Sequence, residues 1–188
     1  VEYNGIKFFD NQGYKLSDEL EDEIEEIIRN DLEIVPRPTI GLGTRDYAEE
    51  ALNDYIRFLT KTTQERFSGI KVALDCANGA AYKAAPLALL DLGASMCIIH
   101  NEPDGVNIND HCGSTHMEDL KELVRTNGAD IGFAFDGDAD RCLAVDENGE
   151  LIDGDQILAI CGLDMRQRGA LQKDTIVGTV MSNLGLTK

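Results

Sequence analysis

Apolar and polar positions along the chain predict strands that alternate with helices. Short apolar or β-branched runs bounded by turn residues predict strands, and they cover residues 5–9, 70–74, 94–99, 131–135, 142–145, 151–152 and 175–181. Apolar residues at helical spacing predict helices, which begin near Ser17, Asp46, Tyr82, Thr115 and Asp155. Strands separated by helices are typical of an α/β fold, here with mixed, mainly parallel sheets flanked by helices.

Local signals refine several of these elements. Ser17 is a good N-cap for the first helix. Thr115 and Glu118 have the spacing of a capping box. Pro86 has to lie in the first turn of its helix or kink that helix. The dipeptide at residues 148–149, Asn-Gly, predicts a hairpin turn between two strands.

Three carboxylates stand between two predicted strands, at Asp136, Asp138 and Asp140. Charges this close repel one another, so the loop needs a cation unless water solvates it. Oxygen ligands select a hard ion, Mg²⁺ or Ca²⁺. Arg141 adds a fixed positive charge, and a cation beside an arginine suits a phosphate group. The sequence therefore predicts a metal site that can bind phosphate.

Two other interpretations of this loop stay open. Its acidic residues match the first ligand positions of an EF-hand, and Glu147 stands where the closing glutamate would be. An EF-hand needs glycine at the sixth position, however, where this chain has Arg141, and it needs helices rather than strands on both sides. The second alternative is an acidic turn that water alone solvates.

Charge and composition narrow the classes of partner. The 188 residues carry a formal net charge of −18, which argues against nucleic acid and anionic membranes as partners. No apolar run is long enough for a membrane span, and residues 1–4 do not resemble a secretory signal. A chain that begins with Val1 suggests a piece of a longer protein.

Cysteine usage indicates a cytoplasmic protein. The five cysteines are scattered and include no Cys-x-x-Cys pair, so we expect reduced thiols. Zinc could bind these cysteines together with His100, His111 and His116, but the spacing follows no known zinc pattern.

The segment Asp-Gly-Asp-Ala-Asp-Arg at residues 136–141 resembles the metal-binding loop of the α-D-phosphohexomutase family, Asp-Gly-Asp-Gly-Asp-Arg. The resemblance implies that Asp136, Asp138 and Asp140 bind Mg²⁺ and that Arg141 contacts phosphate or substrate. In that family the fourth metal ligand is a phosphate oxygen of a catalytic phosphoserine.

Other segments extend the resemblance. Lys7, in the context Asn-Gly-Ile-Lys, matches the general acid/base lysine that follows the active-site serine loop of the family. That serine loop would lie immediately before Val1. Residues 74–80 and 112–116 resemble the branch of the family that acts on glucosamine phosphate, and His116 could face the active cleft. From the residues alone, the favoured interpretation of Lys7 is an edge-strand lysine, and that of His116 is a histidine near a helix N-terminus without chemistry; only the resemblance assigns them a role.

The resemblance covers essentially the whole chain and implies an internal part of a four-domain enzyme. Residues 1–45 would be the C-terminal part of domain 1, residues 46–150 would be domain 2 with the metal-binding loop, and residues 151–188 would begin domain 3. Prolines and glycines make residues 30–45 the best linker candidate.

The activity implied for the whole enzyme is the interconversion of glucosamine 6-phosphate and glucosamine 1-phosphate. The phosphoryl group would move through a phosphoserine and a sugar bisphosphate with Mg²⁺, and the product would feed peptidoglycan precursors. We expect the chain alone to be inactive. The alternatives are a mutase for glucose or mannose phosphate, and a non-catalytic metal-binding module. The implied partners are a phosphorylated hexosamine and the remaining domains of the enzyme, and a homodimer stays open.

Overall fold

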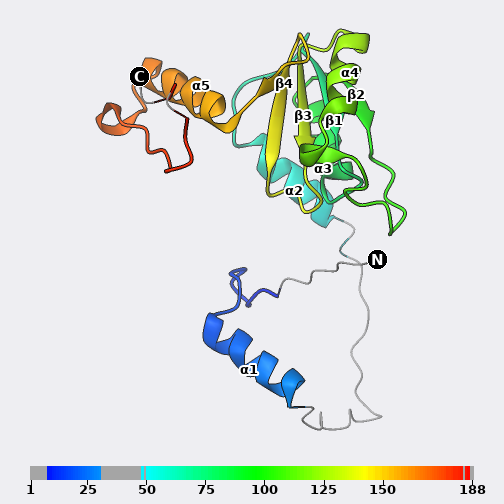
Figure 1. Ribbon diagram of the computed structural model, residues 1–188, viewed down its shortest axis with the longest axis vertical. Coiled ribbons are helices and arrows are strands. Elements are labelled where there is room, and N and C mark those ends of the chain that lie inside the picture. Colours follow the sequence, from blue (N-terminus) through cyan, green and yellow to red (C-terminus); the bar gives the residue numbers. More distant parts are fainter. Residues whose placement is uncertain (1–7, 31–47, 49, 184, 187–188) are drawn as a thin grey trace. The chain divides into compact units, whose positions relative to one another are not determined.

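A computed structural model of the chain describes residues 8–30, 48, 50–183 and 185–186, and it divides into two compact units, Val1–Ala48 and Glu49–Lys188 (Figure 1). Lys7, most of the strand predicted at residues 5–9 and most of the linker predicted at residues 30–45 lie outside the described residues.

The described part of the first unit is a tight turn followed by helix α1 (Asp18–Arg29). Ser17 has an extended backbone, and its hydroxyl accepts a hydrogen bond from the N–H of Leu20 at 3.4 Å. The predicted N-cap is therefore confirmed. Phe9 and Lys15 form a single antiparallel bridge before the helix.

The second unit is built on a five-stranded sheet with the order β2-β1-β3-β4-β5 (Figure 1). β1 (Lys71–Asp75) runs parallel to β2 (Ser95–Ile99) and to β3 (Ile131–Phe135). β4 (Cys142–Asp146) pairs antiparallel with β3 and with β5 (Leu151–Ile152). The α/β class with a mixed sheet is confirmed. Because β1, β2 and β3 are parallel, their carboxyl ends meet at one edge of the sheet.

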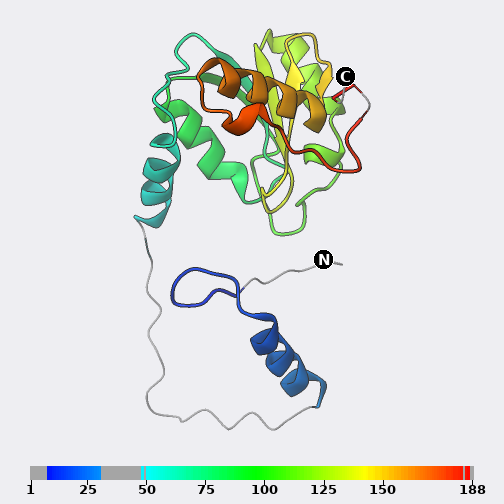
Figure 2. The same cartoon turned by 90° about the vertical axis from the view of Figure 1, so that its left-hand side faces the viewer.

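Helices cover both faces of this sheet. α3 (Ala81–Asp91) contributes Ala81 to the core on one face, and α2 (Ala51–Thr60) packs beside α3 (Figure 2). α4 (Glu118–Asn127) covers the other face. The core beneath α4 consists of Ala73, Met117, Leu120, Val124, Ala129, Ala134 and Val145.

The chain leaves the sheet through β5 into helix α5 (Gly154–Gln167). Asp153 caps this helix, because its side chain accepts from the N–H of Gln156 while the Gln156 side chain accepts from the N–H of Asp153, both at 2.8 Å. A short 3₁₀ turn, η2 (Gln172–Asp174), follows. None of the helices in the described residues is both long and apolar enough to span a membrane.

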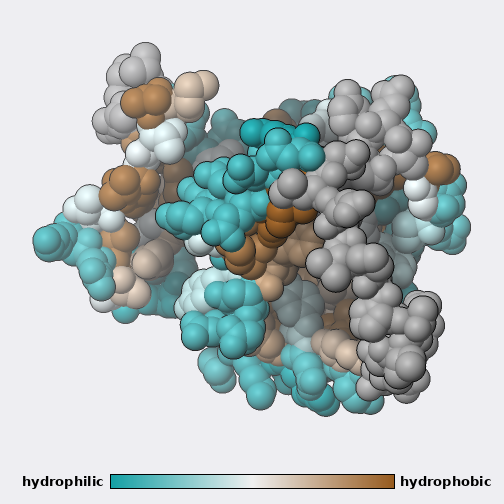
Figure 3. All heavy atoms as spheres, turned by 90° about the horizontal axis from the view of Figure 1, so that it is seen from below, coloured by the Kyte–Doolittle hydropathy of each residue, from teal (hydrophilic) through white to brown (hydrophobic). Residues whose placement is uncertain are grey.

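The strand predicted at residues 175–181 is wrong. Residues 175–179 have no regular structure and residues 180–181 form a turn. Val177 and Val180 are 84% and 100% exposed. The part of the chain after β5 lies at the left of Figure 1, and the left of Figure 3 shows hydrophobic residues on its surface. β-Branched side chains favour a strand only where a neighbouring strand pairs with it, and no described strand pairs with these residues.

Three smaller predictions about helices are also corrected. α2 begins at Ala51 and not near Asp46. Pro86 lies in the middle of α3, so the first-turn alternative is wrong. The capping box of Thr115 and Glu118 does not form, because Thr115 belongs to a separate 3₁₀ turn, η1 (Gly113–Thr115), and its hydroxyl lies 3.1 Å from Nδ1 of His116.

Candidate metal centre

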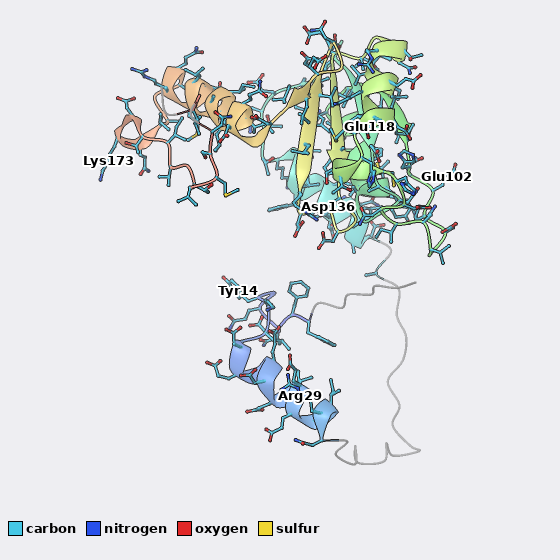
Figure 4. The ribbon with its side chains drawn as sticks, in the orientation of Figure 1. Tyr14, Arg29, Glu102, Glu118, Asp136 and Lys173 are labelled. Atoms are coloured by element: carbon cyan, nitrogen blue, oxygen red, sulfur yellow. The ribbon has the colours of Figure 1, made fainter. Side chains whose placement is uncertain are left out.

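The acidic loop connects the end of β3 to the start of β4, and Figure 4 shows Asp136 at this end of the sheet. Each of Asp136, Asp138 and Asp140 offers one carboxylate oxygen, and these three oxygens lie within 4.8 Å of one another. The flanking elements are strands, so the EF-hand alternative is wrong. A set of oxygen ligands this close together fits a hard divalent cation such as Mg²⁺.

Asp136 is held in place by Arg141. Oδ1 of Asp136 accepts a hydrogen bond from the backbone N–H of Arg141 at 3.0 Å, and Oδ2 accepts from Nε at 2.8 Å. Asp136 is 4% exposed. Burial by itself would raise its pKa, but the backbone and guanidinium hydrogen bonds of Arg141 outweigh burial and hold the pKa below the usual range. The loop is therefore more than a turn solvated by water, because one of its carboxylates is buried and ion-paired.

The backbone of the loop is clamped by the turn that follows β1. The N–H of Ala80 donates to the carbonyl oxygen of Gly137 at 2.8 Å. A Cβ atom on Gly79 would overlap that same carbonyl oxygen, and a Cβ atom on Gly137 would lie 2.6 Å from Nδ2 of Asn109. Gly79 is therefore needed for the close approach of backbone to backbone, whereas a Cβ atom on Gly137 would press on the side chains of Asn109 and Ile108.

The loop departs from the family pattern at Ala139. Its φ angle is 61°, a left-handed conformation that costs about 1–2 kcal/mol for a residue with a Cβ atom. The N–H of Ala139 donates to the carbonyl oxygen of Asp136 at 3.1 Å. The loop thus keeps its tight turn with alanine in a position that favours glycine.

Asp75 is a buried carboxylate that the sequence analysis treated only as part of a turn. It ends β1 with 0% exposure. Its Oδ1 accepts from the N–H of Ala77 at 2.8 Å, and its Oδ2 accepts from the N–H of Gly113 at 2.9 Å. Asp75 thereby joins the turn after β1 to the segment at residues 112–116. A carboxylate directly after an apolar strand and before a tight turn was the available signal.

The structure brings some of the predicted site residues together and leaves others apart. Asp136, Asp138, Asp140 and Arg141 share one loop. His116 is exposed and contacts its own segment, with its ring centroid 5.5 Å from that of His111. Lys7 lies outside the described residues.

Comparisons with known proteins identify the family. The sequence profile described as phosphoglucomutase/phosphomannomutase, alpha/beta/alpha domain II, matches residues 46–149. The profiles of domains I and III of the same family match residues 1–34 and 153–188. The chain belongs to the phosphoglucomutase/phosphomannomutase family.

Curated relatives share more than half of their aligned residues with this chain. A protein named phosphoglucosamine mutase from Ruminiclostridium cellulolyticum is 60% identical over 98% of the chain. Proteins of the same name from Acetivibrio thermocellus and Clostridium acetobutylicum are 56% and 58% identical. The chain spans 41% of the length of the first two relatives and 42% of the third.

A solved structure supports the fold. The crystal structure of a phosphoglucomutase/phosphomannomutase family protein from Burkholderia thailandensis superposes with a TM-score of 0.62 at 24% sequence identity. The match covers 81% of this chain and 32% of that protein.

Proposed function

We propose that this chain is the part of a phosphoglucosamine mutase that carries the metal-binding loop. The whole enzyme would interconvert glucosamine 6-phosphate and glucosamine 1-phosphate. Support comes from relatives of that name that are 56–60% identical over nearly the whole chain, and from a compact oxygen-ligand loop at the end of β3. Within that enzyme, residues 1–45, 46–150 and 151–188 would belong to domains 1, 2 and 3.

The proposed cofactor is Mg²⁺, held by Asp136, Asp138 and Asp140. A bound Mg²⁺ ion would neutralise negative charge on the phosphoryl group that is being transferred. The three carboxylates suit this ion because they offer only oxygen atoms. The phosphoserine that donates the phosphoryl group would belong to the part of the enzyme outside these 188 residues.

Arg141 is the proposed phosphate ligand. Its contacts with Asp136 and Asp140 run through Nε, at 2.8 Å and 3.7 Å. These contacts orient the guanidinium, and its Nη groups would donate a pair of parallel hydrogen bonds to phosphate oxygens. The side chain is 71% exposed, so an incoming phosphate can reach it.

The proposed roles of Lys7 and His116 rest on the family resemblance alone. Lys7 would move a proton to or from the reacting sugar hydroxyl, provided that neighbouring cations lower its pKa. His116 would contact the phosphorylated hexosamine. The other partners would be the remaining domains of the enzyme. The five cysteines form no disulfide, which supports a cytoplasmic location.

The test is an assay of the full-length enzyme on glucosamine, glucose and mannose phosphates, with and without Mg²⁺. We expect a Mg²⁺-dependent preference for glucosamine phosphate. Asp138→Ala should lower kcat/KM at least about 100-fold, because a metal ion supplies several kcal/mol of charge stabilisation in the transition state. Glu147→Ala is the matched control, since it removes an exposed acidic residue from the neighbouring turn, and its activity should stay unchanged.

Each other outcome changes a different part of the proposal. A preference for glucose or mannose phosphate would keep the mechanism and overturn the substrate. No activity on any of the three sugars, from a protein that folds and binds Mg²⁺, would reduce the acidic loop to a non-catalytic metal-binding module.

A further inference from the structure

A second group of metal-ligating side chains lies where β1 and β2 end. It consists of Asp75, His100 and Cys112, and one ligand atom from each residue lies within 4.8 Å of the other two. Asp75 and Cys112 are both 0% exposed. Carboxylate, imidazole and thiolate are the three side-chain ligands that zinc uses in proteins. We call this group the Asp75 cluster.

Three separate segments build the Asp75 cluster. Asp75 ends β1, His100 directly follows β2, and Cys112 directly precedes η1. Because β1 and β2 are parallel neighbours, Asp75 pairs with Ile99 and His100 arrives beside the carboxylate. The residues are far apart in the chain, which is why their spacing matches no zinc motif.

Nδ1 of His100 is the observation that points to a ligand. This atom is buried, and it forms no hydrogen bond with any of the described residues. It lies 3.1 Å from Oδ2 of Asp75, so the distance would allow a hydrogen bond but the direction does not. A buried polar atom left without a partner is uncommon, and an absent ion is one of the explanations for it.

The other ring nitrogen of His100 supports the same conclusion. Nε2 faces Oδ2 of Asp119 at 3.5 Å. Each ring nitrogen of His100 thus has a carboxylate beside it, Asp75 at Nδ1 and Asp119 at Nε2. When a metal ion binds Nδ1, the single proton of the neutral ring stays on Nε2, where the carboxylate of Asp119 can hold it. Histidine ligands of metal ions almost always have such a carboxylate, carbonyl or water at the second nitrogen.

The two remaining ligands can also accept a metal ion. Each oxygen of Asp75 accepts one backbone hydrogen bond, and a carboxylate oxygen has a second lone pair. Burial, and next the negative charge of Asp75, raise the pKa of the Cys112 thiol to about 11. The free thiol therefore keeps its proton at neutral pH, and a metal ion has to displace that proton to solvent, so Zn²⁺ should bind more tightly as the pH rises.

We propose that Asp75, His100 and Cys112 bind a divalent zinc ion, at a site chemically distinct from the oxygen-only acidic loop. Three protein ligands leave a fourth position for water or another ligand. The ion would fasten the loop at residues 100–112 to the end of β1. That loop also carries Asn109, whose N–H donates to Ala77 and whose side chain borders Gly137, so zinc would stiffen the surroundings of the acidic loop.

Co²⁺ is the probe that separates the two sites, because only a thiolate ligand gives a sulfur-to-cobalt charge-transfer band. The protein would be stripped of metal, saturated with Mg²⁺ to fill the acidic loop, and titrated with Co²⁺. We expect a charge-transfer band that saturates at one Co²⁺ per protein and disappears on addition of Zn²⁺. Cys112→Ser and Cys112→Ala should both abolish the band, and Asp119→Asn should weaken Zn²⁺ binding by about 10–100-fold.

Control variants test whether another thiol, the acidic loop or misfolding could account for the result. Cys97→Ala removes another partly buried thiol of the same sheet, and Asp138→Asn alters the acidic loop, so both should keep the band. Far-ultraviolet circular dichroism should show that the Cys112 variants fold, and Zn²⁺ should raise the unfolding temperature of the wild type but not of these variants. Absence of the band in the wild type, or its persistence in folded Cys112→Ala, would overturn the site.

Discussion

The position of the acidic loop depends on the lack of a side chain at Gly79. Gly79 and Gly137 approach each other so closely that any Cβ atom on Gly79 would overlap the carbonyl oxygen of Gly137. The same oxygen accepts the hydrogen bond from Ala80. Backbone atoms cannot rotate aside as a side chain can, so the position of Asp136 and its neighbours depends on the absence of one methyl group.

Gly79→Ala should therefore displace the loop. We expect the free energy of unfolding to fall by about 1–3 kcal/mol, the range for an added methyl group in a tightly packed site, and Mg²⁺ to bind more weakly. Urea unfolding and calorimetric titration with Mg²⁺ measure the two effects. Gly154→Ala is the control, because a Cβ atom there meets nothing within 4 Å. Equal stability and Mg²⁺ affinity in the two variants would contradict the steric account.

The side chain of Asp146 stabilises the turn between β4 and β5. Its Oδ1 accepts from the N–H of Glu150 at 2.7 Å and from the N–H of Asn148 at 3.0 Å. The hydrogen bond from Glu150 is the largest of the effects that lower the pKa of Asp146 from 3.8. The folded state thus favours the ionised carboxylate, so its contribution to stability is present above pH 3.8 and is lost as pH falls through the lower folded pKa.

The amide chemical shift of Glu150 measures this titration directly. We expect it to change with a midpoint below pH 3.8 in the wild type, because protonation weakens the hydrogen bond. Asp146→Asn keeps an oxygen acceptor but removes the titrating group, so the same amide should show no transition at that midpoint. A wild-type midpoint at or above 3.8 would mean that the turn does not favour the ionised carboxylate.

Elements with strong local signals were predictable from the sequence. The helix after Ser17, the strand at residues 131–135 and the turn at residues 148–149 carry their caps and turn residues within a few positions. The strand predicted at residues 175–181 failed because a strand depends on a partner from elsewhere in the chain. The proximity of His100 and Cys112 to Asp75 was equally beyond local patterns, since the pairing of β1 with β2 and the backbone bond to Gly113 create it.

In the acidic loop, too, some features follow from the local sequence and others depend on contacts with distant residues. Asp136, Asp138 and Asp140 stand two residues apart, so their clustering follows from one tight turn. The ion pair of Asp136 with Arg141 and the clamp by Gly79 depend on burial and on a distant turn. A residue pattern can therefore point to the candidate metal ligands, while the groups that position these ligands and shift their pKa values are found only in the folded structure.

At the scale of the whole molecule, the chain matches parts of three domains of longer relatives. It matches three successive domain profiles of one family but spans 41% of the length of the relatives from Ruminiclostridium cellulolyticum and Acetivibrio thermocellus. The region matched to domain III exposes apolar side chains that a domain core usually buries. They include Ile160 and Leu163 at 58% and Met181 at 86% exposure. The described part of this region therefore leaves apolar surface uncovered.

We expect the purified 188-residue chain to bind Mg²⁺ through its acidic loop and yet to show no mutase turnover. The three carboxylates proposed to bind Mg²⁺, Asp136, Asp138 and Asp140, lie in one loop of this chain, and water can take the place of the phosphoserine oxygen as a further ligand. Turnover also needs the phosphoserine, which the family resemblance assigns to a loop outside this chain. A coupled assay on glucosamine 6-phosphate tests the expectation, with Asp138→Ala purified in parallel to measure host enzyme carried through purification. Turnover above that background would show that the chain contains its own phosphoryl donor, and it would overturn the assignment of the donor to the rest of the enzyme.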